Sequence, residues 1–305
     1  MRRTASKRRP PRTLAFGAAF CLLAAPPCPP VGLGRQRVVE APARAQTRPL
    51  LGVTLSAEVA SWLGEVEGKL GKEVYAEFAE LDEAGAAGDY TLGVSYLTRE
   101  GEAVVRVDES FRGRGARATE AVIAHELLHL RLRARGFPLF LFSPEVMTAR
   151  GPAEDVEQSN VNDLVSLIEH RMFAPEMRRA GFDKLIDLTN GLEAARRRRG
   201  RRDGQAEALN FARAALEWDD PRLLEELARV HRANGWGRSL ADGRRLAEII
   251  RGADIRTPDA VAPVFLRCMS VLYRAGFGVE RDRRFALSAI YPQMLIHAAR
   301  PRRRR

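Results

Sequence analysis

Residues 121–130 carry the most informative pattern of the chain, Ala121-Val122-Ile123-Ala124-His125-Glu126-Leu127-Leu128-His129-Leu130. No Pro or Gly interrupts residues 116–135, so this region predicts one α-helix. Residues four apart lie on the same face of a helix, so His125 and His129 can bind one ion. Glu126 lies close to that face and can reach a water on the same ion. The pattern therefore predicts a metal centre with two imidazole ligands and one carboxylate base.

Two predicted strands precede this helix. Residues 90–97 and 103–107 have strand-like apolar patterns, and the Gly-containing segment 98–102 suits a hairpin turn. Helical periodicity over residues 57–70 comes earlier in the chain. We expect an α+β core in which a short sheet packs on the helix of residues 116–135. An edge strand of that sheet can pair with an extended peptide.

The chain from residue 185 onward predicts helices alone. The candidate helices are residues 206–218, 221–234, 240–250, 261–275 and 284–298. An arginine-rich run at residues 196–202 precedes them and is typical of a solvated linker. We therefore divide the chain into a leader at 1–45, a metal-binding core at 46–190, a linker at 191–204, an all-α C-terminal domain at 205–299 and a basic tail at 300–305.

The formal net charge of +11 belongs mainly to the two ends of the chain. Residues 1–45 contain nine Lys or Arg and one Glu, and residues 300–305 contain five Arg. Residues 46–299 consequently carry a net charge of −2. Because the basic runs lack interleaved aromatic residues and a nucleic-acid motif, we expect no nucleic-acid partner.

Residues 1–45 have the pattern of a secretory leader. Six basic residues up to Arg12 precede an apolar run at residues 13–25, which is too short to span a bilayer as a helix. Ala43-Arg44-Ala45 fits a small-x-small cleavage site. We expect export to the periplasm or the extracellular space, with no transmembrane span in the mature chain. An uncleaved anchor, or a start codon placed too far upstream, would give the same pattern.

A catalytic zinc site needs a third protein ligand besides an open position for water. One compact pattern places a Gly three residues and a His six residues after the second His, but Leu132 and Arg135 stand there. The remaining candidates lie downstream and are Glu145, Glu154, Glu157, Glu169 and His170. On a helical wheel of residues 160–173, Glu169 borders the apolar face, whereas His170 lies nearly opposite its centre. Glu169 is therefore our predicted third ligand, with His170 as the alternative.

His125-Glu126-Leu127-Leu128-His129, followed 40 residues later by Glu169, resembles the gluzincin branch of zincin-type zinc metallopeptidases. The resemblance covers about residues 90–175, and its specific part is the His-Glu-x-x-His motif. It implies a zincin-like core with one Zn²⁺ held by His125, His129 and Glu169. It further implies hydrolysis of a peptide or protein substrate by a metal-activated water, with Glu126 as general base.

Further residues of such a site stay open at this point. A second donor usually stabilises the oxyanion, and the candidates are His231, Tyr273, Tyr291 and His297. Asn162 or Asp163 can orient an imidazole through its other nitrogen. The alternative function is an exported helical protein that binds a metal or a partner without turnover.

Overall fold

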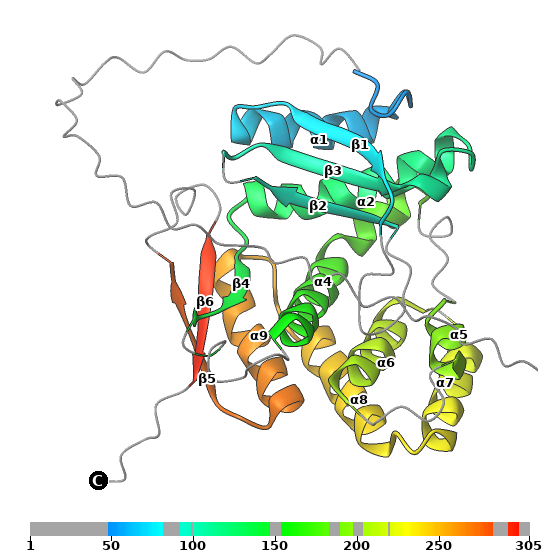
Figure 1. Ribbon diagram of the computed structural model, residues 1–305, viewed down its shortest axis with the longest axis vertical. Helices are drawn as coiled ribbons and strands as arrows, with labels where there is room; N and C mark the ends of the chain where they lie inside the picture. Colours follow the sequence, from blue (N-terminus) through cyan, green and yellow to red (C-terminus); the bar gives the residue numbers. More distant parts are fainter. Residues whose placement is uncertain are drawn as a thin grey trace, which may run out of the picture. The chain divides into compact units, whose positions relative to one another are not determined.

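The computed structural model describes residues 48–81, 92–98, 100–144, 146, 154–182, 190–197, 204–218, 220–282 and 292–298 (Figure 1). The predicted leader (1–45) and basic tail (300–305) lie outside the described residues, and so do Glu145 and Tyr291. Export therefore stays a prediction. Within the described residues, no helix is both long and apolar enough to cross a membrane.

The first sheet contains the predicted hairpin. Strands β2 (Gly93–Leu97) and β3 (Ala103–Asp108) pair antiparallel, and Gly101, with a φ of 77°, lies in the turn between them. Strand β1 (Val74–Ala79) adds to the far side of β3 in parallel, so the strand order is β1-β3-β2. The hairpin prediction is confirmed, and β2 is an edge of this sheet among the described strands.

Helix α2 (Ala116–Ala134) carries the His-Glu-x-x-His motif, as predicted. It contacts α1 (Ala57–Leu70) as well as strands β2 and β3, and twelve of its 19 residues are buried. It begins after Gly115 and ends before Gly136, whose φ angles of 89° and 88° belong to the left-handed region that glycine tolerates best. This burial gives the motif residues a rigid support.

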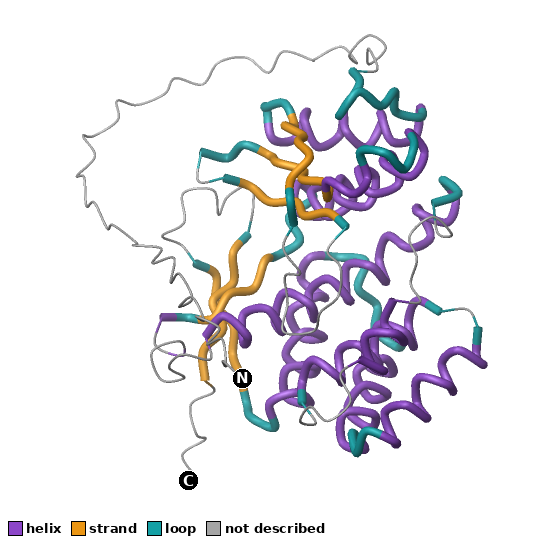
Figure 2. Tube along the Cα trace, turned by 45° about the vertical axis from the view of Figure 1, so that its right-hand side comes forward, coloured by secondary structure: helices purple, strands orange, loops and turns teal. Residues whose placement is uncertain are grey.

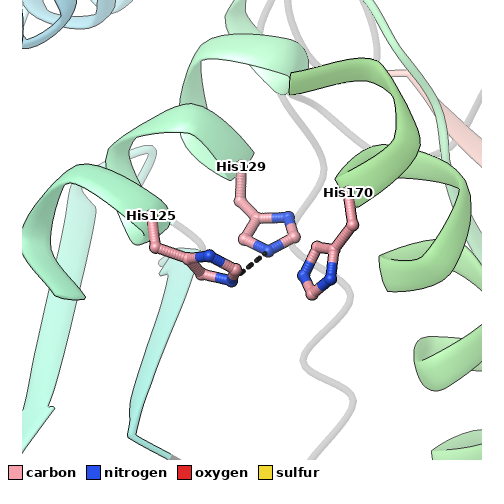
Figure 3. A group of neighbouring side chains, drawn as sticks. All are labelled: His125, His129 and His170. Carbon is pink, nitrogen blue, oxygen red and sulfur yellow. Dashed lines mark hydrogen bonds between the residues drawn. The ribbon is translucent and has the colours of Figure 1, made fainter. Parts of the chain in front are cut away.

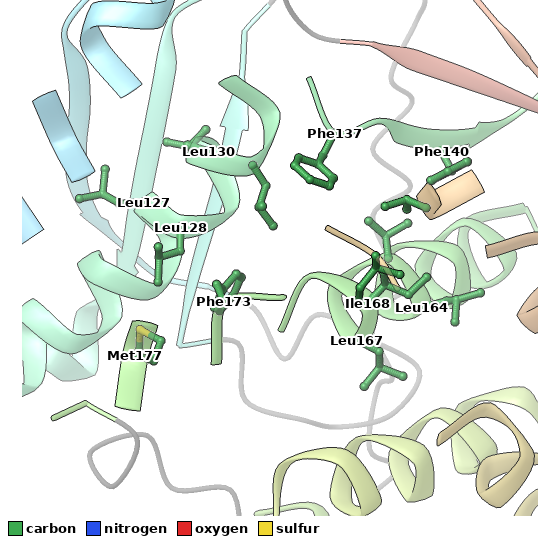
Figure 4. Close-up of a cluster of buried hydrophobic side chains, with 14 of the residues drawn as sticks. Leu127, Leu128, Leu130, Phe137, Phe140, Leu164, Leu167, Ile168, Phe173 and Met177 are labelled. Carbon is green, nitrogen blue, oxygen red and sulfur yellow. The ribbon is translucent and has the colours of Figure 1, made fainter. Parts of the chain in front are cut away.

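Helix α4 (Glu154–Arg179) contacts α2 and brings the second group of candidate ligands to the motif. Buried leucines of the two helices belong to one hydrophobic core (Figure 4). This core extends along the sequence from Leu50 to Ile296. It therefore includes residues from both the predicted metal-binding core and the predicted C-terminal domain.

Five further helices follow α4 in the described part of the sequence. They are α5 (Asn190–Arg197), α6 (Gln205–Glu217), α7 (Pro221–Ala233), α8 (Gly237–Arg251) and α9 (Pro258–Tyr273). Among them, α6, α8 and α9 contact α4, and part of the predicted linker at 191–204 is helical because α5 forms there. A second, smaller hydrophobic cluster is shared by α5, α6, α7 and the start of α8.

The prediction that the C-terminal domain is entirely helical is wrong. Strands β5 (Phe277–Arg281) and β6 (Gln293–Ala298) form a second three-stranded sheet with β4 (Leu139–Phe142), in the order β4-β6-β5. Figure 2 shows these strands beside the helical part. The pairing of β4 with β6 is parallel and joins segments about 150 residues apart. The periodicity of a short apolar run such as residues 293–298 fits a strand as well as a helix. Pairing with the distant strand β4 decides between the two structures.

Close packing of α8 on α6 depends on Gly243. A Cβ atom at this position would lie 2.6 Å from the Ala208 carbonyl oxygen and 2.9 Å from Phe211 Cβ. We expect Gly243→Ala to lower the free energy of unfolding by about 1–3 kcal/mol, because the helices must separate. Chemical denaturation of the variant and the wild type measures this difference in the free energy of unfolding. Gly237→Ala in the same helix is the control, because a Cβ there meets nothing within 4 Å. Equal loss of stability in both variants would contradict the packing argument.

Candidate metal centre

Three histidines come together between α2 and α4. One donor nitrogen each of His125, His129 and His170 lies within 4.8 Å of the other two (Figure 3). The Nε2 atoms of His125 and His129 are 3.2 Å apart. The side chains of His129 and His170 are each 16% exposed, so the cluster lies at the border between core and solvent. Such a position suits a metal site that keeps one coordination position open.

Phe173 closes one side of this histidine cluster. It is buried one turn after His170 on α4, and its ring centroid lies 4.9–5.3 Å from those of the three imidazoles. The three rings therefore meet an apolar wall on one side, which limits the approach of water there.

The imidazoles of His125 and His170 are held in the neutral form that binds metals. Burial lowers the pKa of His125 well below its usual value, and the nearby His170 and His129 lower it further. Burial likewise lowers the pKa of His170, together with the charges of His129 and Arg213. A neutral imidazole offers a lone pair to an ion, so this electrostatic environment favours coordination.

Glu169, the predicted third ligand, instead supports His129. Its Oε2 lies 2.6 Å from His129 Nδ1, and it also forms a buried ion pair with Arg133. Burial raises the pKa of Glu169, but Arg133 and His129 outweigh this effect and leave its pKa below the usual value. The Nδ1–H of His129 consequently donates to a carboxylate, which leaves Nε2 for an ion.

The structure thus places His170, rather than Glu169, with His125 and His129. Both neighbours reach the motif helix: Glu169 contacts His129 and Arg133, whereas the imidazole of His170 lies beside those of His125 and His129. The helical wheel of α4 located the border of its apolar face. It did not show that the imidazole of His170 reaches the two motif histidines, because the packing of two helices depends on side chains from both.

His170 has a carboxylate partner of its own, which the sequence did not reveal. Glu217, at the end of α6, forms a 2.6 Å hydrogen bond with His170 Nδ1. Burial raises the pKa of Glu217 to about 7. The Ser166 hydroxyl lies 3.0 Å from His170 Nε2. A single glutamate 47 residues away on a different helix carries no local signal, so neither spacing nor composition pointed to Glu217.

Replacing Glu217 by Gln tests its support of His170. Partners that hold a metal-binding imidazole by its second nitrogen typically contribute 10–100-fold to metal affinity, so we expect Glu217→Gln to weaken zinc binding by about that factor. Competition with a chromophoric chelator measures the dissociation constant. Glu65→Gln is the control, because Glu65 pairs with Arg131 and Arg135 instead of a histidine of the cluster. An unchanged zinc affinity in Glu217→Gln would show that Glu217 does not contribute to the metal site.

Glu126 lies against strand β2. A Cβ atom at Gly93 would come within 3.0 Å of Glu126 Cγ and 2.7 Å of Val122 Cγ1, so this glycine allows the strand to approach α2 closely. Burial raises the pKa of Glu126, while His129 and a hydrogen bond with Ser95 act in the opposite direction without cancelling the rise. A carboxyl group with a raised pKa is a better general base near neutral pH.

The other candidates from the sequence lie in different surroundings. His231 is buried between the rings of Phe211 and Trp236, at centroid distances of 5.4 and 5.3 Å. Tyr273 packs edge-on against Phe142 and Phe277. His297 covers Gly278 in the second sheet.

The side chains proposed to orient an imidazole also have other partners. Asn162 accepts a hydrogen bond from Gln158, and Asp163 pairs with Arg213. Of the remaining carboxylate candidates for the third ligand, Glu157 lies three turns before Glu169 on α4, and the side chain of Glu154 is outside the described part of the chain.

Comparisons of the chain with protein-family models, with curated proteins and with solved structures gave no match. The functional argument therefore depends on the geometry of the three histidines, their two carboxylate partners and Glu126.

Proposed function

We propose that His125, His129 and His170 bind one Zn²⁺ and that the protein hydrolyses peptide bonds. The observation that carries this proposal is the convergence of three imidazole nitrogens within 4.8 Å beside the buried Glu126. Three imidazole ligands with an open fourth position are a set typical of catalytic zinc. Carboxylate-rich sites, by contrast, suit magnesium, calcium or manganese.

The surroundings of the three histidines support metal binding. Glu169 holds His129 and Glu217 holds His170, each through Nδ1 at 2.6 Å. A carboxylate on the outer nitrogen fixes the tautomer and the ring orientation, and it makes the inner nitrogen more basic. Beside these two pairs, one nitrogen of each of the three rings lies within 4.8 Å of the other two, as the ligands of one ion do.

The proposed chemistry assigns one role to each group. Bound zinc supplies a Lewis acid that activates water and polarises a carbonyl group. Glu126 accepts a proton from the attacking water and transfers it to the leaving amine. Its raised pKa suits both halves of this transfer, and its contact with Gly93 and hydrogen bond with Ser95 keep the carboxyl group in place.

Strand β2 supports a peptide as the substrate. Among the described strands it pairs with β3 alone, so its opposite edge can form backbone hydrogen bonds with an extended chain. Gly93 and Ser95 of this strand contact Glu126, which places the edge strand directly beside the proposed general base.

The test combines metal analysis with a peptide-cleavage assay on the purified chain. We expect one zinc per chain, cleavage of peptides from a mixed library, loss of cleavage with a chelator and recovery on adding zinc. Stoichiometric zinc without cleavage of any peptide would favour the alternative of a metal-binding protein without turnover. A chain that binds no zinc would contradict both functions.

A further inference from the structure

A serine hydroxyl lies at the metal-binding nitrogen of His170. Ser166 Oγ is 3.0 Å from His170 Nε2, and Glu217 binds the other ring nitrogen, Nδ1, at 2.6 Å. Because the Nδ1–H donates to the carboxylate, the Nε2 lone pair accepts a hydrogen bond from the hydroxyl. The imidazole of His170 is turned toward those of His125 and His129 (Figure 3). Ser166 therefore lies at the edge of the histidine cluster.

Helix α4 fixes the position of this hydroxyl. Ser166 precedes His170 by four residues, so the two side chains lie on the same face of the helix, one turn apart. The neighbouring Leu167 and Ile168 are buried in the hydrophobic core, which holds this part of α4 in place. Ser166 itself is half-buried, so a ligand can approach it. A donor on such a rigid support needs no rearrangement of the backbone to act.

The hydroxyl and a metal ion need the same lone pair. Since Glu217 engages Nδ1 of His170, Nε2 is the nitrogen left for coordination. A zinc–imidazole bond along this lone pair is about 2.0–2.1 Å long. The Ser166 hydroxyl, at 3.0 Å from the same atom, therefore loses its acceptor when His170 binds the metal. Its O–H then lies free beside the metal centre, where an oxygen that enters the open coordination position can accept it.

We propose that Ser166 donates a hydrogen bond to the oxygen of the scissile carbonyl group during hydrolysis. This inference depends on the proposed function. Attack of water on the carbonyl carbon moves an electron pair to the carbonyl oxygen, and a positioned donor stabilises this developing charge. Ser166 keeps its proton and stays neutral throughout. It thus acts as the second donor, for which His231, Tyr273, Tyr291 and His297 were candidates by residue type alone.

Two inhibitors with one peptide sequence, that of a peptide the wild type cleaves, test the proposal by binding alone. In the first, a phosphinate replaces the scissile bond and presents two oxygens that share a negative charge. In the second, a thiol binds the metal through sulfur, which is a weak hydrogen-bond acceptor. Calorimetry on the zinc-loaded full chain gives both dissociation constants. We expect Ser166→Ala to bind the phosphinate at least about 10-fold more weakly than the wild type does, because a hydrogen bond to a charged group is lost. It should bind the thiol as tightly as the wild type does.

Further measurements assign the effect to the hydroxyl group. Ser166→Thr keeps the hydroxyl and is expected to retain most of the phosphinate affinity. Ser270→Ala is the matched control, because Ser270 is an exposed helix residue on α9 whose hydroxyl donates to the Arg267 carbonyl oxygen at 2.8 Å. It should bind both inhibitors as the wild type does. The zinc affinity of Ser166→Ala, measured with a competing chelator, is expected to be unchanged or higher, since a competitor for His170 Nε2 has been removed.

The outcomes separate this inference from the proposed function. Unchanged phosphinate affinity in Ser166→Ala, or equally weak phosphinate binding by Ser166→Thr, overturns the donor role and leaves the zinc site intact. An equal loss of affinity for both inhibitors, or weaker zinc binding, in Ser166→Ala also overturns it, because the hydroxyl then acts by orienting His170. Absence of phosphinate binding by a wild-type chain that has taken up zinc overturns both the peptidase proposal and this inference.

Discussion

Glu126→Gln is expected to keep one zinc per chain and to lower the rate of peptide cleavage by about 10²–10⁴-fold, the usual contribution of a general base. Gln has nearly the shape of Glu, so it fits the same close contact with Gly93. It cannot accept a proton from water in the same way. Steady-state cleavage of a fluorogenic peptide, with zinc content measured on the same sample, checks both parts of the expectation.

Glu120→Gln is the matched control for this experiment. Glu120 is also buried on α2, but it accepts a hydrogen bond from the Ser56 backbone N–H and pairs with Arg117. Its replacement is expected to lower stability without changing the cleavage rate of the folded fraction. A Glu126→Gln variant that cleaves at the wild-type rate would exclude Glu126 as the base.

His170→Ala is expected to lose stoichiometric zinc. Removal of a direct ligand should weaken binding by more than the 10–100-fold that typically follows loss of an outer partner such as Glu217. The expected order of zinc affinity is wild type, then Glu217→Gln, then His170→Ala. Equilibrium dialysis against buffered zinc gives all three dissociation constants under the same conditions.

His297→Gln is the control for loss of an imidazole, because His297 lies in the second sheet against Gly278. It should bind zinc as tightly as the wild type does. If His170→Ala retained its zinc while Glu169→Gln lost it, the original prediction from the sequence would be restored. The buried ion pair of Glu169 with Arg133 makes a stability measurement necessary for the second variant.

Local patterns account for the parts of the site that the sequence predicted. The spacing of His125 and His129, the uninterrupted helix and the hairpin before it each depend on residues that are neighbours in the chain. Helix periodicity and turn chemistry are local properties, so they can be recognised without knowledge of the fold. The same holds for the position of Glu126 beside its two histidines.

Contacts between distant segments account for what the sequence did not reveal. The choice between Glu169 and His170 depends on how α4 packs on α2, and Glu217 reaches His170 only because α6 packs on α4. Strand β6 depends on pairing with β4. In each case the deciding partner lies at least 40 residues away, where periodicity carries no information.

The central claim is that three imidazoles bind one metal ion, and X-ray absorption spectroscopy of the zinc-loaded chain tests it most directly. Multiple scattering from imidazole rings gives the number of histidine ligands. The proposed site predicts three imidazole nitrogens at about 2.0–2.1 Å. In His170→Ala at saturating zinc, the number should fall to two. A wild-type spectrum with two imidazoles and a protein carboxylate, unchanged in His170→Ala, would contradict the proposed metal centre.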